Sequence, residues 1–385
     1  MSASSPTPSL TPALLGAIAA MMVAMGIGRF AYTPILPAMM AEAGLSAATA
    51  GLLASINYAG YFAGSLCAIW MPSGEARLWP FRACLLLSVA TTIGMGFDGD
   101  LVVWGALRFL SGVASAGALL LAAAMTLDRI TEAGRASLSG FPFIGVGGGT
   151  ALSGLVVDLT ASRLGWHEQW MALGGLSVAL GLIAWFCVLP IQGKGDARSD
   201  AKPAKQPLTA KGALLIADYG LVGAGYIVTG TFLVALLKAD PATAEIGARA
   251  WTLAGLAAMP SVVLWSLLGG RIGWRRALLL AHGVQALGIL SPILFASAWA
   301  ALAGAALWGS TFVALTAMTF AAAREQSGAA AGRQIALLTT WFSVGQMLGP
   351  LGAGLLADWT GGLEAGLIAA ALAIGLGAIF LALTR

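Results

Sequence analysis

The sequence predicts an all-α integral membrane protein with twelve transmembrane helices arranged as two pseudo-symmetric six-helix bundles. The prediction rests on an apolar composition, a succession of long hydrophobic runs and an internal repeat. Of the 385 residues, 59% are hydrophobic and only 9% are charged, and the mean hydropathy is +0.88. A soluble domain carries about 25% charged residues, so this chain cannot cover a surface in water.

Hydrophobic runs of roughly 20 residues, the length at which a helix crosses a bilayer, set the predicted helices. We expect twelve of them, at residues 12–40, 46–71, 80–97, 101–127, 136–160, 168–190, 212–237, 248–270, 275–295, 297–323, 332–357 and 363–384. Pro34 and Pro37 near the end of the first run predict a kink in its last turns. The 52 glycines and 13 tryptophans fit closely packed helices with aromatic side chains at the bilayer surfaces.

The distribution of Lys and Arg predicts the orientation, because short cytoplasmic loops of membrane proteins are enriched in basic residues. With both termini in the cytoplasm, that side carries 15 basic residues and the outer side carries 3, which are Arg163, Lys238 and Arg249. The first twelve residues contain no Lys or Arg, so we expect no cleavable signal peptide. We therefore expect a multi-pass protein of the cytoplasmic (inner) membrane.

One long polar stretch, residues 191–211, divides the chain into six predicted helices on each side. Its mixture of Gly, Pro, Lys and Asp is typical of a flexible linker, which we expect in the cytoplasm. The predicted domains are an N-terminal six-helix bundle at 1–190, the linker at 191–211 and a C-terminal six-helix bundle at 212–385.

The two halves also repeat one another. At an offset of 200 residues, the set Gly145, Gly149, Gly154 and Asp158 recurs as Gly345, Gly349, Gly354 and Asp358. Two further pairs recur at similar offsets, Trp104-Gly105 with Trp308-Gly309 at 204 and Gly26-x-Gly28 with Gly223-x-Gly225 at 197. Tight helix packing explains any single glycine equally well, so the common offset carries the inference. Two repeated halves place a central cavity at their interface, as in alternating access.

More specific patterns lie in individual spans. Span one contains GIGRFAYTP at 26–34 followed by Leu36-Pro37, and span two contains NYAGY at 57–61 with Gly64. Span seven contains Tyr219-Gly220 and GAGY at 223–226, and span eleven contains Gly345-Gln346 with Gly349-Pro350. With these residues, which extend over most of the chain, the sequence resembles a major facilitator superfamily transporter and, more narrowly, its YbfB/YjiJ-like branch.

The resemblance implies the major facilitator fold and secondary transport. RFLSG at 108–112 fits the superfamily's arginine motif in span four, and FIGVGGG at 143–149 fits its glycine-rich motif in span five, without the proline usual there. The loop at 71–77, after span two, matches the superfamily's charged motif poorly, and the loop at 269–276, after span eight, lacks the Asp. We therefore do not expect an Asp–Arg lock in these loops.

Ionised side chains are costly in hydrocarbon, so each one inside a span is a candidate for a site. Arg29 in span one and Arg108 in span four both fall in the outer half of the bilayer by helix rise. A guanidinium suits a carboxylate, phosphate or sulfonate. We expect Arg29 to anchor a substrate or coupling ion, the alternative being an Arg held by carbonyls of a kinked helix. For Arg108 the motif favours proton coupling, the alternative being structural pairing.

Asp218 is the one carboxylate plainly inside a predicted span, and we expect it to couple transport to protons. Buried carboxylates and histidines form the proton relays of membrane transporters. Alternatively, Asp218 reaches cytoplasmic water or pairs with Lys211 or Arg333. His282, the intramembrane histidine, is a second proton-coupling candidate, the alternative being a hydrogen-bonded packing residue.

Neutral polar and aromatic residues complete the predicted cavity, with hydrogen bonds between helices as the alternative for each. The expected substrate-binding set is Arg29, Tyr32, Asn57, Tyr58, Tyr61, Arg108, Tyr226, Trp341 and Gln346, and Tyr219 and Thr229 are further cavity candidates. The repeat places Tyr226 where Arg29 lies in the first half. This correspondence predicts a cation and a phenol on opposite sides of the cavity.

These features predict a secondary active transporter that works by alternating access on a small organic solute. Two intramembrane arginines against one carboxylate favour an organic anion. Protons are the expected coupling ion, and symport and antiport both remain open. The alternative is a proton-antiport exporter of drugs or lipophilic compounds, which would more naturally carry unpaired acids in its spans.

Other classes of protein are poorly supported. An intramembrane enzyme would need a nucleophile with a base or a metal cluster, and the sequence has 2 histidines and no H-E-x-x-H motif. Cys67, Cys84 and Cys187 show no metal or redox spacing. No G-x-x-x-x-G-K-[ST] motif occurs, so we expect no ATP, cofactor or metal. We expect a monomer in a lipid bilayer, with no nucleic-acid partner.

Overall fold

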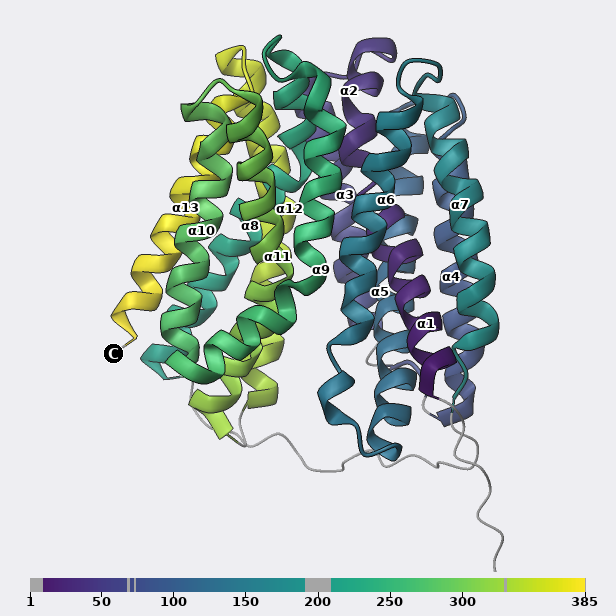
Figure 1. The fold of residues 1–385 in the computed structure, drawn as a ribbon, viewed down its shortest axis with the longest axis vertical. Helices are drawn as coiled ribbons and strands as arrows, with labels where there is room; N and C mark the ends of the chain where they lie inside the picture. The colour runs from purple at the N-terminus through teal and green to yellow at the C-terminus, as the bar shows by residue number, and fades with distance from the viewer. Residues whose placement is uncertain (1–9, 68–69, 73, 191–208, 329–330, 385) are drawn as a thin grey trace, which may run out of the picture.

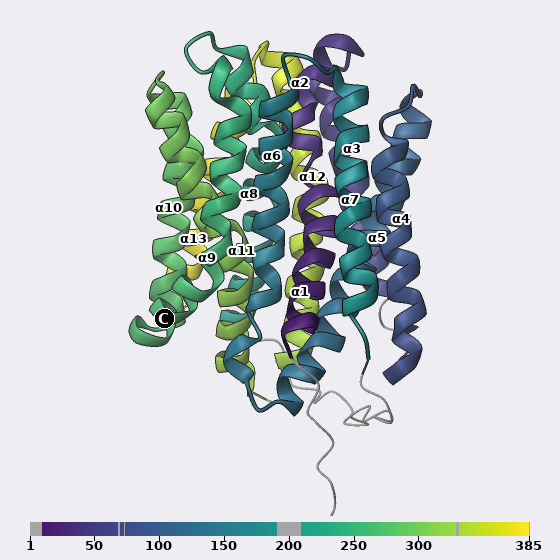
Figure 2. The same ribbon diagram turned by 45° about the vertical axis from the view of Figure 1, so that its right-hand side comes forward.

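The computed structural model describes residues 10–67, 70–72, 74–190, 209–328 and 331–384. Throughout these residues the regular structure is helical, without a strand, which confirms the predicted all-α class. The helices stand side by side and run between two ends of the molecule (Figure 1). The first helix begins and the last helix ends at the same end, which we call the terminal end (Figures 1 and 2).

Twelve crossings connect the two ends. The first consists of α1 (Leu10–Met21), the π-helix η1 (Met22–Ile27) and α2 (Tyr32–Glu42). The others are α3 (Ala47–Cys67), α4 (Leu78–Gly94), α5 (Leu101–Glu132), α6 (Ile144–Thr160), α7 (Trp166–Cys187), α8 (Ala210–Ala239), α9 (Gly247–Ile272), α10 (Trp274–Leu294), α11 (Ala298–Ser327), α12 (Ala331–Thr360) and α13 (Glu364–Leu383). Each predicted span corresponds to one crossing, and most ends differ by a few residues. The fifth differs most, because two short 3-10 turns precede α6.

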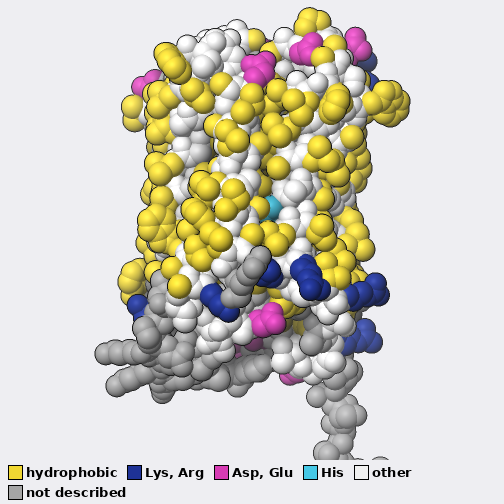
Figure 3. All heavy atoms as spheres, turned by 90° about the vertical axis from the view of Figure 1, so that its left-hand side faces the viewer, with side chains coloured by type: hydrophobic (Ala, Val, Ile, Leu, Met, Phe, Trp, Pro, Cys, Tyr) yellow, Lys and Arg dark blue, Asp and Glu magenta, His cyan; other side chains and the backbone are white. Residues whose placement is uncertain are grey.

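Nine of the crossings, counted over the described residues, are long and apolar enough to span a membrane. The other three are α4, which has 17 residues, and the pair α3 and α12. Helices α3 and α12 pack against each other, so small and polar side chains take the place of lipid-facing apolar ones. Figure 3 shows a broad hydrophobic band on one side of the molecule, with Lys and Arg side chains gathered toward the terminal end.

Helices α1–α7, here the N-half, and α8–α13, the C-half, form the right and left groups of Figure 1. The halves meet where α3 packs on α12, α6 on α9 and α2 on α8. Most of the predicted linker at 191–211 lies outside the described residues, which resume at residue 209. The two largest contacts between the halves, α3 with α12 and α6 with α9, are equivalent to each other under the internal repeat.

The first crossing is irregular, but its main irregularity precedes the prolines. The backbone departs from the α-helix in η1 and in the turn at 28–31, whereas Pro34 and Pro37 lie within α2. Pro34 is the third residue of α2, where a helix tolerates the missing N–H. The sequence predicted a kink in the last turns of this crossing, whereas the break in its helical backbone lies in the middle, at residues 22–31.

The repeated glycines make equivalent close contacts in the two halves. A Cβ on Gly145 would lie 2.2 Å from a carbonyl oxygen of α1, and one on Gly345 would lie 2.1 Å from a carbonyl oxygen of α8. A Cβ on Gly154 would lie 2.8 Å from a carbonyl oxygen of α9, and one on Gly354 would lie 2.3 Å from a carbonyl oxygen of α3. Each half therefore packs one small-residue helix against its own first helix and against the second helix of the other half.

The repeated aspartates join the halves at the end opposite the termini. Asp358 near the end of α12 accepts hydrogen bonds from the backbone N–H groups of Ala47 at 3.0 Å and Ala48 at 3.1 Å, where α3 begins. Asp158 near the end of α6 pairs with Arg249 at the start of α9 over 3.1 Å. A helix cap contributes about 1 kcal/mol, and an exposed ion pair contributes less than about 1 kcal/mol. Both contacts are therefore individually weak.

Adding a methyl group should test the contact between α3 and α12. Gly354→Ala would bring a Cβ to 2.3 Å from a backbone oxygen, so we expect the free energy of unfolding to fall by about 1–3 kcal/mol. Gly352→Ala on the same helix is the matched control, since no atom lies within 4 Å, and it should raise stability by about 0.5–1 kcal/mol. Thermal unfolding of the purified protein in detergent measures both. Equal shifts of the same sign would contradict the packing described.

Candidate functional site

The break in the first crossing leaves backbone carbonyls that need donors from elsewhere. In this segment the N–H of Gly28 donates to Val23 O at 2.8 Å and that of Phe30 donates to Met25 O at 3.2 Å, both five residues back. Helix α5 supplies the missing donors. Ser111 Oγ donates to Gly28 O at 2.8 Å.

Arg108 supplies the other donors to the break. Its two terminal nitrogens donate to Gly28 O and Arg29 O, each at 3.4 Å, and the Tyr32 ring covers the guanidinium at 4.6 Å. Asn57 Nδ2 donates to the backbone oxygen of Arg108 at 2.8 Å, and the Tyr32 hydroxyl donates to Ala50 O at 3.0 Å. Three residues of the expected substrate-binding set are therefore engaged inside the N-half, and the structural alternative describes Arg108 well.

Arg29 is in a different environment. Its side chain is buried, and its guanidinium lies over the rings of Tyr61 at 4.3 Å and Tyr58 at 4.5 Å. No acceptor among the described residues takes a hydrogen bond from Nε or Nη2. Cation–π contacts offset part of the desolvation of a buried cation, but unpaired N–H groups in a dry site are costly. Arg29 is thus placed to bind an anionic acceptor.

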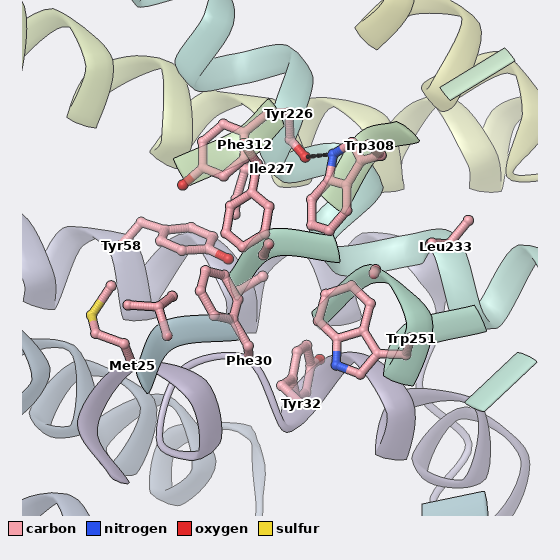
Figure 4. Packing of buried hydrophobic residues seen from close by; sticks show 14 of the residues in the cluster. Met25, Phe30, Tyr32, Tyr58, Tyr226, Ile227, Leu233, Trp251, Trp308 and Phe312 are labelled. Atoms are coloured by element: carbon pink, nitrogen blue, oxygen red, sulfur yellow. Dashed lines mark hydrogen bonds between the residues drawn. The ribbon is translucent and has the colours of Figure 1, made fainter. Parts of the chain in front are cut away.

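A column of stacked aromatic rings in the C-half lies next to this cation. Its members, in order, are Tyr219, Phe342, Tyr226, Phe312, Trp308 and Trp251, with successive ring centroids 4.3, 5.4, 6.2, 4.7 and 5.6 Å apart. Phe30, the neighbour of Arg29, points its ring at Phe312 with centroids 5.8 Å apart. Figure 4 shows Phe30 and Tyr58 of the N-half facing Phe312 and Tyr226 across the boundary.

Tyr226 brings polar groups to the same place. Gln346 Nε2 donates to the Tyr226 hydroxyl, and Trp308 Nε1 donates to the Tyr226 backbone oxygen at 3.1 Å (Figure 4). Phe30, the neighbour of Arg29, and Tyr226 both contact Phe312, so the segments that the repeat relates approach the same ring. Within the described part of the chain, Gln346 Oε1 has no hydrogen-bond partner.

Two candidates lie apart from this group. Trp341 is 53% exposed and shares a face of α12 with the exposed side chains of Leu348 and Leu355, seven and fourteen residues on. Residues seven apart point to the same side of a helix. Trp341 therefore lies on the exposed outer face of α12 together with these leucines. Thr229 is buried on α8, and its hydroxyl makes no hydrogen bond to the described residues.

Three side chains at the edge of the group are only partly buried. Tyr61, Thr316 and Phe342 keep some exposed surface, whereas Tyr58, Phe30 and Tyr226 are buried. Tyr219, which donates to the Thr316 hydroxyl and stacks on Phe342, is buried as well. The exposed surface of the group is therefore confined to single side chains on α3, α11 and α12.

The two proton-coupling candidates Asp218 and His282 form one pair. His282 Nε2 lies 2.8 Å from Asp218 Oδ1, and both side chains are fully buried. His282 Nδ1 donates to Leu278 O at 2.7 Å, so this nitrogen carries a hydrogen. The short contact between Nε2 and Oδ1 then requires a second hydrogen, on the imidazole or on the carboxyl group. The pair therefore holds one exchangeable proton.

The pair lies away from Arg29. Asp218 faces α10 and α13, and a Cβ on Gly377 of α13 would lie 2.6 Å from Asp218 Oδ1. Tyr219, the next residue on α8, stacks in the aromatic column instead. The alternatives for Asp218 did not include His282, 64 residues further along the chain, which lies 2.8 Å from it.

The fold and this central site define a class of protein. Twelve crossings in two repeated halves, with a buried cation between them, make a membrane transporter of the major facilitator superfamily and not an enzyme. The chain belongs to the family described as "Uncharacterised MFS-type transporter YbfB", which matches residues 21–382. The resemblance inferred from the sequence motifs is thereby confirmed.

Solved structures show the same fold at low sequence identity. The nucleoside transporter NupG is 16% identical, with a TM-score of 0.73 over 97% of this chain and 98% of that chain. A bacterial homologue of the human lysosomal transporter Spinster, in an inward-facing and unoccupied conformation, is 17% identical, with a TM-score of 0.73 over 99% and 98% of the two chains. A search of curated protein sequences gave no match.

Sequence reasoning missed the apolar part of the site. Phe30, Phe312 and Phe342 contact the aromatic partners of the site but look like ordinary lipid-span residues in the sequence. Ser111 lies inside the arginine motif at 108–112, but it was not named as a candidate residue. Trp308 was marked by the repeat, though not as a neighbour of Tyr226.

The support of the break by α5 is testable with two serines. Ser111→Ala removes a donor from Gly28 O, and we expect a loss of about 1–2 kcal/mol in the free energy of unfolding because a buried carbonyl loses its short hydrogen bond. Ser115→Ala removes a hydroxyl that bonds only Gly112 O of its own helix, so stability should change little. Thermal unfolding in detergent compares them. Matching losses would show that the bond across helices is unimportant.

Proposed function

We propose that the chain is a proton-coupled secondary transporter of a small organic anion that works by alternating access. The observation that carries the proposal is the Arg29 guanidinium, which is buried between two tyrosine rings with two nitrogens that no described residue accepts from. A buried cation of this kind is stabilised by an anion that reaches it. A cationic solute would be repelled at the same place, which disfavours a cation exporter.

The charges near the centre support an anion further. Arg108 adds a second buried cation, whose guanidinium is bound to carbonyls rather than to a carboxylate. Asp218 is paired with His282 and is directed away from Arg29. The centre therefore has an excess of positive charge that a carboxylate, phosphate or sulfonate would neutralise.

Alternating access is supported by the weak contacts that join the halves. We infer that residues 1–190 and 212–385 move as two bundles and that the contacts of Asp158 and Asp358 break when the opposite end opens. The basic side chains at the terminal end support cytoplasmic termini in an inner membrane, by the positive-inside tendency. NupG and the Spinster homologue are transporters by their titles, which supports transport but supplies no substrate for this chain.

We assign proton coupling to Asp218 and His282 rather than to Arg108. The pair holds one exchangeable proton in a dry environment, whereas the Arg108 guanidinium is held by the broken crossing. Helix α8 carries both Asp218 and the tyrosines of the aromatic column, so a shift of α8 would move the proton pair and the anion site together. Whether the solute and the proton move in the same direction depends on the order in which they bind.

The anion site can be tested before the substrate is known. Thermal shifts of the purified protein with carboxylates, phosphates, sulfonates, organic cations and neutral metabolites should show stabilisation by an anion, which reaches about 2.7 kcal/mol at 100 times its Kd. The effect should disappear in Arg29→Lys, because an ammonium lacks the planar fork of a guanidinium. Arg82→Lys is the control, since Arg82 also stacks on tryptophans, at 4.5 Å from Trp185, but lies elsewhere.

Stabilisation by cations or neutral lipophiles alone would contradict the anion site. The same result would make the drug exporter the better interpretation.

Proton coupling can be tested in proteoliposomes loaded with the anion found in that panel. In Asp218→Asn and in His282→Gln we expect exchange of the anion across the membrane to continue, while its accumulation driven by a pH gradient is lost. The reason is that either change removes the shared proton but leaves Arg29 in place. His167→Gln is the matched control, because His167 makes an equally short contact of 2.8 Å with Asp98 at the surface. Accumulation that persists in Asp218→Asn would place the coupling elsewhere.

A further inference from the structure

The geometry points to an aromatic monocarboxylate as the anion, with its carboxylate on Arg29 and its ring against the aromatic column. This inference rests on the anion site proposed above and narrows its substrate class.

The free edge of Arg29 matches a carboxylate. Nε and Nη2, the two nitrogens without an acceptor among the described residues, lie on the same edge of the planar guanidinium. Two parallel N–H groups on one edge fit the two oxygens of a carboxylate in a bidentate arrangement. The guanidinium carbon lies 4.5 Å from the Tyr58 centroid and 4.3 Å from the Tyr61 centroid, so these rings occupy part of the space around the group while its Nε–Nη2 edge stays unpaired.

One cation is available to the ligand, which favours one negative charge. Arg108 Nε also lacks an acceptor among the described residues, but both terminal nitrogens of this guanidinium donate to backbone carbonyls and the Tyr32 ring lies over it, so no pair of N–H groups on one edge is left for a carboxylate. A dicarboxylate would leave its second charge among buried aromatic rings. Burying an unpaired charge is far more costly than burying a ring.

The C-half contributes flat aromatic groups to the boundary between the halves. Tyr226 and Phe312 present nearly parallel rings, 6° apart, and Phe342 continues the stack at 11° to Tyr226. Phe30 adds an edge from the N-half, 83° to the Phe312 ring. Planar rings gain offset-stacked and edge-to-face contacts on such a surface, and a saturated ring of the same size does not.

Two polar groups of the protein lie at the Tyr226 ring. The Tyr226 hydroxyl and the Gln346 amide lie together, and Gln346 Oε1 makes no hydrogen bond within the described ranges. A ligand with a hydroxyl group on its ring would satisfy such an acceptor. Among aromatic carboxylates, we therefore expect a hydroxylated one to bind more tightly than the parent compound.

Matched ligands test the ring and the charge separately. Benzoate, 4-hydroxybenzoate, cyclohexanecarboxylate, benzamide and benzyltrimethylammonium are compared by thermal shift on the full chain in detergent. We expect benzoate to bind about three- to tenfold more tightly than cyclohexanecarboxylate, as stacking contacts provide, and 4-hydroxybenzoate to bind more tightly than benzoate. Benzamide, which has the ring without the charge, and benzyltrimethylammonium should not stabilise the protein.

Variants locate the effect. Phe312→Leu should abolish the preference for benzoate over cyclohexanecarboxylate while leaving the latter's affinity unchanged. Gln346→Leu removes the amide acceptor but keeps the rings, so it should retain that preference and lose the gain from the 4-hydroxyl group. Arg29→Lys should weaken both carboxylates, and it keeps a charge in place should Arg29→Ala fail to fold. Arg82→Lys should change none of these values.

The outcomes separate this inference from the proposed function. Equal binding of benzoate and cyclohexanecarboxylate, both dependent on Arg29, would overturn the aromatic class and leave the anion site intact. Binding of benzyltrimethylammonium or benzamide without binding of any carboxylate would overturn both. The absence of any shift with benzoate at millimolar concentration, where another anion stabilises the protein, would also overturn the inference.

Discussion

A backbone carbonyl without a helical partner has to find a donor inside the protein when it lies within a bilayer. The first crossing breaks at residues 28–31, and Arg108 and Ser111 of α5 donate to the carbonyls that the break exposes. These hydrogen bonds permit irregular backbone at the centre of a membrane protein. Because the chain turns there instead of continuing as a helix, Arg29 and Phe30 reach the boundary between the halves, where the C-half aromatic rings lie.

The two buried arginines therefore differ in their hydrogen-bond partners. Both terminal nitrogens of Arg108 donate to backbone carbonyls, so the alternative stated for Arg29, an arginine held by carbonyls of a kinked helix, describes Arg108. Arg29 lies against tyrosine rings and has its edge free, so it keeps hydrogen-bonding capacity for a ligand. The same residue type at the same depth acquires opposite roles because of its neighbours, since the positions of acceptors decide which N–H groups remain unpaired.

Helix α8 carries residues of both the proposed anion site and the proposed proton pair. One residue, Tyr219, stacks in the aromatic column, and its neighbour Asp218 faces His282 on the other side of the helix. The small residues of α12 and α13 allow α8 to approach closely on both sides, since a Cβ on Gly345 or Gly377 would collide with it. A rigid helix gripped on two faces transmits displacement at one site to the other, which is the requirement for coupling two ligands.

Much of the fold followed from the sequence alone. Length and hydropathy set the twelve crossings because a bilayer has a fixed thickness, and the offset of 200 residues marked glycines and aspartates that make equivalent contacts. Arg29, Tyr58, Tyr61, Tyr226 and Gln346 were named as candidates because polar groups are conspicuous in apolar spans. Phe30, Phe312 and Phe342 were not, since an apolar ring facing a site and one facing lipid look alike in a sequence. The pairing of Asp218 with His282, the exposure of Trp341 and the separate roles of the two arginines depend on which helices pack together and how they are rotated, and hydropathy carries no information about rotation.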